Sequence, residues 1–215
     1  MKQVRGFTLV EVAIVLVIVG LLLSAFLAPL SAQRDLKDYS QVRTDLAQIQ
    51  EALYGFAVAN GRLPCPDTTG DGIADSCVGL TSATSTPGNL PWVTLGVQAN
   101  DPWNRPYQYR VNDAFGTIFT LNIPSSGAGI LKVYTDSALV NTVANNVPAV
   151  IYSSGKNGAV QPPITADELE NRITVGTKFD ANFVSHDFSP TFDDVVVWIS
   201  PNILFNRMVA AGKLP

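Results

Sequence analysis

The feature that most constrains this chain is an apolar run of 22 residues near its start, from residue 7 to residue 28. As an α-helix the run would be about 33 Å long, which is enough to cross the hydrocarbon core of a bilayer. Lys2 and Arg5 precede it and none of the first six residues is acidic, so we expect the amino end to stay in the cytoplasm. A conventional secretory signal has a shorter apolar region, whereas this run continues into another helical pattern without a clear break, which favours an anchor that is kept. We predict one membrane span at residues 7–28.

Glu11 does not suit an ordinary membrane anchor. A lone carboxylate inside an apolar span costs on the order of a few kcal/mol unless it is paired or protonated. The stretch GFTLVE at 6–11 resembles the type IV prepilin motif, which has a short basic leader, a glycine, and a phenylalanine with glutamate fifth in the mature chain. The alternative, from the residues alone, is a plain anchor whose Glu11 lies near the headgroups, less than two turns from the basic end.

The resemblance implies how the first residues are used. A prepilin peptidase would remove leader residues 1–6 by cutting between Gly6 and Phe7 on the cytoplasmic face, and the new amine of Phe7 would be methylated. Glu11 would pair with the amine of a neighbouring subunit during assembly. Gly6 suits a protease because a residue without a side chain lets an extended backbone enter a tight site. Glu11 suits assembly because docking against an opposite charge relieves an unpaired charge in lipid.

Residues 29–60 continue the helix with an amphipathic pattern. Pro29 is expected to kink the helix or to loosen one turn. Beyond it the apolar residues are spaced by threes and fours, as on one face of a helix: Leu36, Tyr39, Val42, Leu46, Ile49, Leu53 and Phe56. Asn60-Gly61 is a typical helix stop. We predict a helix from residue 7 to about residue 59 whose second half is covered by the rest of the chain, and the alternative is a coiled-coil stalk.

Residues 61–215 are predicted to form a β-rich globular domain on the periplasmic or extracellular side. Runs of β-branched and aromatic residues bounded by turn formers predict strands at 107–111, 117–123, 130–135, 149–153 and 195–200. We expect an antiparallel sheet packed on the second half of the long helix, which is an α+β fold. A last short helix is expected, with Ser200 as N-cap, Pro201 at its first position and Gly212 as its stop.

Three short stretches resemble the major pseudopilin of type II secretion systems. DPWNRPYQY at 101–109 resembles that family's DPWGNPYQY, with Asn104-Arg105 where the family has Gly-Asn. SSGKNG at 153–158 and DDV at 193–195 are similar to its later Ser-x-Gly-x-(Asp/Asn)-Gly and Asp-Asp-(Ile/Val) elements. The segment 65–100 and the terminal helix have no counterpart in that compact pseudopilin, so a minor or specialised pilin fits as well as a major one.

The aromatic residues of the first stretch have a simpler interpretation without the family. Trp103, Tyr107 and Tyr109 are expected to be core and turn residues rather than a ligand platform, because aromatic side chains chiefly supply buried area.

Cys65 and Cys77 are the two cysteines of the chain, with eleven residues between them and turn formers throughout. This spacing predicts one small disulfide loop and an oxidising compartment outside the cytoplasm, and the alternative is a pair of free thiols.

The loop between the cysteines resembles the first part of a calcium loop. Asp67, Thr69, Asp71 and Asp75 place oxygen atoms at its positions one, three, five and nine, with glycine at six. The twelfth position lacks the bidentate acid, so a turn-rich loop without metal is the alternative. The pseudopilin resemblance suggests a second calcium candidate near Asp193-Asp194, because calcium stabilises a C-terminal loop in that family.

The composition and the motifs predict neither a nucleic-acid-binding protein nor an enzyme. The net charge of −4 and the pI near 4.9 give no overall basic surface. The single histidine, His186, lies in a polar stretch and is expected to be a solvated loop residue; no Gly-x-Ser-x-Gly motif occurs. The carboxylates of Asp167, Glu168 and Glu170 fit a helix start after Thr165 better than a catalytic cluster.

The leading hypothesis is therefore a structural subunit of a pilus or a secretion pseudopilus. Its expected partners are a prepilin peptidase, other pilin or pseudopilin subunits, the inner membrane and an assembly platform. A second hypothesis is a low-copy binding module at a filament tip, with residues 65–100 contacting a surface, a secreted substrate or DNA. A third is a membrane-anchored periplasmic binding protein that never polymerises, which predicts an uncut leader.

Overall fold

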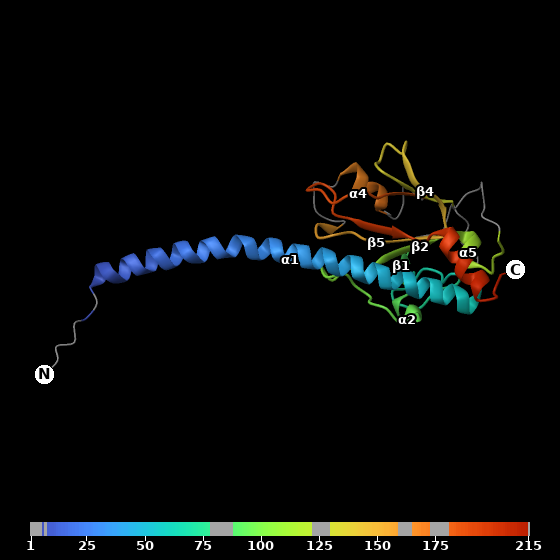
Figure 1. Ribbon diagram of the computed structural model, residues 1–215, viewed down its shortest axis with the longest axis horizontal. Coiled ribbons are helices and arrows are strands. Elements are labelled where there is room, and N and C mark those ends of the chain that lie inside the picture. The colour runs from blue at the N-terminus through green and yellow to red at the C-terminus, as the bar shows by residue number, and fades with distance from the viewer. Residues whose placement is uncertain are drawn as a thin grey trace. The chain divides into compact units, whose positions relative to one another are not determined.

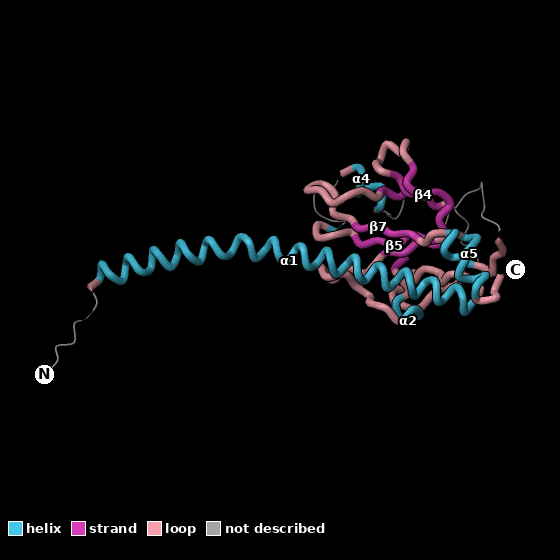
Figure 2. The backbone as a smooth tube through the Cα atoms, viewed as in Figure 1, coloured by secondary structure: helices cyan, strands magenta, loops and turns pink. Residues whose placement is uncertain are grey.

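The computed structural model describes residues 6, 8–77, 88–121, 130–158, 165–172 and 181–214, without the side chains of 24–32. The chain divides into an N-terminal unit, Met1–Ser40, and a C-terminal unit, Gln41–Pro215. Figure 1 traces the helices and strands in chain order, and Figure 2 colours them by type.

One long helix, α1, runs from Leu9 to Asn60 and continues through position 29 without interruption. It ends as predicted, with Gly61 in the left-handed region at a φ of 72° and the Gly61 N–H bonded to the Ala57 carbonyl at 2.8 Å.

The predicted membrane span falls on the first part of this helix. Within the described ranges, no helix is both long enough and apolar enough to span a membrane. Phe7 and the side chains of 24–28 lie outside the described residues, and the span at 7–28 stays a prediction.

The apolar stripe of α1 is buried from residue 42 onward. Val42, Leu46, Ile49 and Leu53 are at most 1% exposed, because their spacing puts them on the helix face that packs on the domain. Leu36 was expected to belong to this stripe, but it is 72% exposed and lies in the N-terminal unit.

A four-stranded antiparallel sheet packs on this stripe. It has the order β1-β2-β5-β7 and consists of β1 (Gly88–Asn89), β2 (Gln108–Val111), β5 (Ala149–Ser153) and β7 (Val195–Trp198). Tyr109 pairs with Ile151, and Ile151 pairs with Val197. Tyr109 and Ile151 share one buried cluster with Leu46 and Leu53 of α1. The structure confirms the predicted α+β fold and, in this sheet, the predicted strands β2, β5 and β7.

A second sheet covers the other face of β5. It has the order β4-β3-β6 and consists of β3 (Leu131–Tyr134), β4 (Thr142–Val147) and β6 (Asn182–Val184), with β3 and β6 parallel. Val150 and Tyr152 of β5 pack against this sheet in a second cluster with Val133 and Phe183, because successive strand residues point to opposite faces. The sequence predicted β3 but not β4 or β6.

The strand predicted at 117–123 is wrong for residues 117–121, and 122–123 lie outside the described residues. The short helix α3, Asp113–Gly116, precedes an irregular segment in which Ile118 is 81% exposed. Phe119 is held by aromatic packing instead of a strand ladder, with its ring centroid 4.8 Å from that of Phe115 and 6.0 Å from that of Phe205. The sequence pattern that predicted a strand at 117–123 therefore reflects the burial of the Phe119 side chain.

Three further helices are found among the described residues of the C-terminal unit: α2 (Trp92–Leu95), α4 (Ala166–Asn171) and α5 (Pro201–Ala210). Helix α5 begins at Pro201 as predicted and buries Leu204 and Met208 in the main cluster. Its Arg207 forms an ion pair with Glu51 of α1 at 2.6 Å.

Candidate functional site

Thr8 and Glu11 cap the start of α1 reciprocally. The Thr8 N–H and the Thr8 hydroxyl each donate to Oε2 of Glu11 at 2.8 Å, and the Glu11 N–H donates to the Thr8 hydroxyl oxygen at 3.3 Å. This is a capping box, which turns the carboxylate of Glu11 back toward the amino end of the helix. The sequence interpretation missed Thr8, although the Thr-x-x-Glu spacing is the signal that could have found it.

Gly6 is exposed, and a Cβ added there would meet no atom within 4 Å. Packing among the described residues therefore does not require a glycine at this position. Phe7, the other residue of the predicted cleavage site, lies outside the described residues.

Cys65 and Cys77 form the predicted disulfide, with their Cα atoms 5.5 Å apart. In the loop that they close, the side chains that were predicted to bind a metal form hydrogen bonds with other groups of the same loop. Asp67 is 1% exposed and accepts N–H bonds from Gly70 at 2.6 Å and Gly72 at 2.8 Å.

The other predicted metal ligands in this loop also form hydrogen bonds within it. The Thr69 hydroxyl donates to Asp67 at 3.3 Å, and Asp71 accepts the N–H of Ile73 at 2.9 Å. Asp75 accepts both the hydroxyl and the N–H of Thr68, and these bonds hold the pKa of Asp75 below its ordinary value. The loop is thus closed by its own hydrogen bonds, and calcium at Asp67, Thr69, Asp71 and Asp75 stays a prediction.

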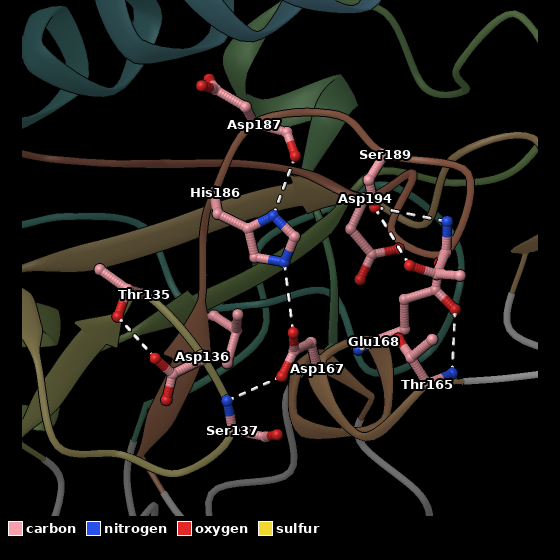
Figure 3. Close-up of polar contacts among 12 residues, drawn as sticks. Thr135, Asp136, Ser137, Thr165, Asp167, Glu168, His186, Asp187, Ser189 and Asp194 are labelled. Atoms are coloured by element: carbon pink, nitrogen blue, oxygen red, sulfur yellow. Dashed lines mark hydrogen bonds and ion pairs between the residues drawn. The ribbon is translucent and has the colours of Figure 1, made fainter.

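Three acids come together elsewhere in the C-terminal unit. One carboxylate oxygen from each of Glu168, Asp193 and Asp194 lies within 4.8 Å of the others, and all three residues are buried. Figure 3 shows Glu168 on α4 near Asp194. We call these three residues the acidic cluster.

Hydrogen bonds with surrounding groups hold the acidic cluster in place. Glu168 accepts the side-chain amide of Asn157 at 2.9 Å and the N–H of Asp193 at 3.1 Å. Asp193 accepts the N–H of Asn157 at 2.7 Å, and Asp194 accepts the side-chain amide of Asn171 at 2.9 Å. The same Glu168 closes a capping box with Thr165, which confirms the predicted helix start.

Burial is the main cause of a shift in the pKa of Asp194. Together with the charges of Glu168 and Asp193, burial raises this pKa to about 7, against the lowering effect of the hydrogen bond from Asn171. Carboxylate oxygens are among the oxygen ligands that calcium takes in proteins. The residues therefore fit a calcium ion, and Glu168, Asp193 and Asp194 would hold it.

The stretches 101–109, 153–158 and 193–195 meet beside the acidic cluster. Asp101 accepts the N–H of Arg105 at 2.9 Å and the hydroxyl of Ser153 at 2.6 Å. The Arg105 guanidinium donates to the carbonyls of Gly155 and Lys156. Gly155 has a φ of 62°, and a Cβ there would overlap Asp193, so glycine allows this close approach.

Asn104 explains one departure from the pseudopilin pattern. Its φ is 62°, in the left-handed region that glycine adopts most readily and asparagine tolerates better than most residues. Asparagine can therefore adopt the conformation of this turn at the position where the family's motif has glycine. Tyr107 and Tyr109 are fully buried, as predicted, and their hydroxyls donate to Asp45 and to the Pro64 carbonyl at 3.0 Å.

Comparisons with known proteins agree with these features. Residues 1–27 match the family model described as a prokaryotic N-terminal methylation motif. Type II secretion system core protein G of Aeromonas hydrophila is 32% identical over 118 residues, which cover 54% of this chain and 80% of that protein. The chain belongs to this pseudopilin family. The core protein G of Klebsiella pneumoniae is 33% identical over 109 residues, covering 50% of this chain and 75% of that protein. The core protein G of Vibrio cholerae is 28% identical over 130 residues, which cover 59% of this chain and 84% of that protein. No solved structure matches this pseudopilin.

The single histidine of this pseudopilin is exposed in a loop, as predicted, and its ring also contacts two side chains. Nε2 of His186 lies 3.3 Å from Oδ2 of Asp167 (Figure 3). The centroid of the His186 ring lies 3.9 Å from that of Phe192. Burial would raise the pKa of Asp167, but hydrogen bonds from Ser137 and His186 outweigh it and hold that pKa below its ordinary value. These contacts tie the loop before Asp193 to α4.

Proposed function

We propose that this pseudopilin is made as a precursor and becomes a subunit of a type II secretion pseudopilus. A prepilin peptidase removes residues 1–6 by cutting between Gly6 and Phe7 at the cytoplasmic face of the inner membrane, and the new amine is methylated. The match of residues 1–27 to the methylation motif carries this proposal. The exposure of Gly6 supports it, because a Cβ there would meet no atom of the described residues within 4 Å, and recognition by a protease would account for the glycine.

Glu11 guides assembly in this proposal. Residues 7–28 hold the subunit in the inner membrane until an assembly platform brings it to other subunits of the filament. Thr8 supplies two hydrogen-bond donors to the Glu11 carboxylate in the single subunit. The methylated amine of a neighbouring subunit then supplies an opposite charge, which lowers the free energy of a carboxylate in an apolar surrounding.

Calcium binding by the acidic cluster is part of the proposal. A bound calcium ion would supply positive charge to offset the carboxylates of Glu168, Asp193 and Asp194. These residues link α4 to the segment that leads into β7, so they would hold the ion between two parts of the C-terminal unit.

No catalytic role is assigned to the chain. The relatives reported above carry the name of a secretion-system core protein, which fits a structural subunit.

Two substitutions test processing and assembly in cells that make the secretion filament. Gly6→Leu is expected to leave the leader attached and to keep the subunit out of sheared filaments. Glu11→Ala is expected to be cut but to enter filaments poorly. Gly20→Leu is the matched control for the first change, because Gly20 also lies on an exposed face with no atom within 4 Å of an added Cβ.

The proposal fails if the Gly6→Leu chain is cut and the Glu11→Ala chain assembles as well as the unsubstituted one. The abundance of the subunit in sheared filaments separates the tip-module hypothesis, which requires a rare protein, from a main structural subunit.

A further inference from the structure

An exposed apolar surface lies where the disulfide loop meets α2. Ile73, Trp92 and Val93 are 53%, 37% and 48% exposed, and we call them the loop patch. Gly72 brings the two segments together, because a Cβ there would lie 2.5 Å from the Trp92 ring and 2.7 Å from Val93. The Gly72 carbonyl also accepts the N–H of Val93 at 2.9 Å. The patch is therefore one continuous surface built from two parts of the chain.

The loop patch is held in one conformation. The disulfide between Cys65 and Cys77 closes the loop, and the buried Asp67 carboxylate accepts the N–H of Gly72 at 2.8 Å. The Thr94 hydroxyl oxygen accepts the N–H of Ala74 at 2.8 Å, which fixes the far side of the loop on α2. A surface held in this way loses little conformational entropy when a partner binds.

Acidic side chains border the loop patch. Asp71 is exposed and accepts the N–H of Ile73, and Asp75 is partly exposed two residues further on. An apolar centre with acidic groups at its border fits a partner surface that combines an apolar side chain with a basic one.

The N-terminal unit of the same chain presents such a surface. Leu36 is 72% exposed on α1, and Lys37 beside it is exposed. A helix turns by about 100° per residue, so Gln33 and Ser40 lie on the face of Leu36 and Lys37, while Asp38 lies on the opposite side from Leu36. This face therefore carries one large apolar side chain and one positive charge.

We propose that the loop patch of one subunit packs on Leu36 and Lys37 of a neighbouring copy of this chain. Leu36 covers Ile73 and Trp92, and the Lys37 ammonium lies near the carboxylate of Asp71. This contact rests on the proposed function, because it requires assembly into a filament.

Cysteine cross-linking between two copies tests the contact. Both native cysteines are in the disulfide, so introduced cysteines are the thiols available for oxidation. Full-length Leu36→Cys and Ile73→Cys chains with different tags are produced together, and assembled filaments are oxidised. We expect a disulfide-linked dimer that carries both tags. Leu36→Cys with Val140→Cys is the control pair, since Val140 is 75% exposed outside the loop patch and is expected to give no dimer.

A charge exchange gives a second readout. Asp71→Lys or Lys37→Asp alone is expected to lower the yield of the dimer several-fold, and the two changes together are expected to restore it. The proposed contact is overturned if filaments form without the disulfide-linked dimer between positions 36 and 73. It is also overturned if the double variant gives no higher yield of this dimer than either single variant. If the unsubstituted chain forms no filaments at all, the proposed function fails and this contact fails with it.

Discussion

Calcium is expected to stabilise the full-length chain in detergent, and to do so more strongly at pH 8 than at pH 5. The reason lies in the acidic cluster, where three buried carboxylates share a small space. Without a cation, the folded chain must either hold a proton on Asp194 or keep the negative charges close together.

The pKa of Asp194 sets the size of this effect. It is about 7 in the folded chain against an ordinary value of 3.8. Because the folded chain binds this proton more tightly than the unfolded chain does, the free energy of unfolding falls as the pH rises between these two values. Between the two pKa values, each pH unit lowers the free energy of unfolding by about 1.4 kcal/mol. Above pH 7 this free energy is therefore about 4 kcal/mol lower than at a pH below the ordinary pKa.

Calcium at a concentration of about 100 times its Kd would add about 2.7 kcal/mol to the free energy of unfolding at pH 8. For a chain of this size, that corresponds to a rise in Tm of about 5–10 °C. At pH 5 the protonated Asp194 competes with the ion, so a smaller rise is expected. Thermal unfolding followed by circular dichroism, with calcium and with a chelator, measures both values.

Two variants decide which acids are responsible. Asp194→Asn removes one buried charge, so it is expected to raise Tm in chelator at pH 8 and to reduce the calcium effect sharply. Asp71→Asn is expected to leave the calcium effect unchanged. An unchanged calcium effect in Asp194→Asn, or its loss in Asp71→Asn, would refute this reasoning and would favour the disulfide loop as the calcium site.

Other changes test the packing and the turns. Leu46→Ala, at a fully buried position of α1, is expected to lower the free energy of unfolding by about 2–5 kcal/mol, whereas Leu36→Ala at an exposed position changes it by less than about 0.5 kcal/mol in denaturant titrations. Cys77→Ser opens the disulfide loop and is expected to lower that free energy by about 2–4 kcal/mol under oxidising conditions, with no effect when the unsubstituted chain is already reduced. Asn104→Gly is expected to keep Tm within a few degrees, and Asn104→Val to lower it by more, because a β-branched residue resists the left-handed conformation.

Local sequence patterns predicted the elements whose signals lie within a few neighbouring residues. The stop of α1 at Asn60, the strand β5 and the start of α5 at Pro201 all follow from short-range chemistry. The strand predicted at 117–123 failed because an alternating pattern does not say whether a partner strand is available. Phe119 instead packs on two other aromatic rings, one of them on α5.

The sites that depend on long-range contacts were predicted only in part. Thr165 and Glu168 indicated a helix start, but nothing local indicates that Glu168 also accepts the N–H of Asp193, which is 25 residues away in the chain. The resemblance pointed to Asp193-Asp194 without a third acid, and the fold supplies it from α4. In the N-terminal unit, Glu11 was predicted only as a charge in the membrane, and the structure adds its capping hydrogen bonds with Thr8.

The mass of the N-terminal peptide, measured on chain purified from the membrane and filament fractions, tests the central claim most directly. We predict a peptide that begins at Phe7 and carries one methyl group on its amine. A peptide that still begins with residues 1–6 in every fraction would contradict the proposed processing, and would favour an anchored protein that never enters a filament.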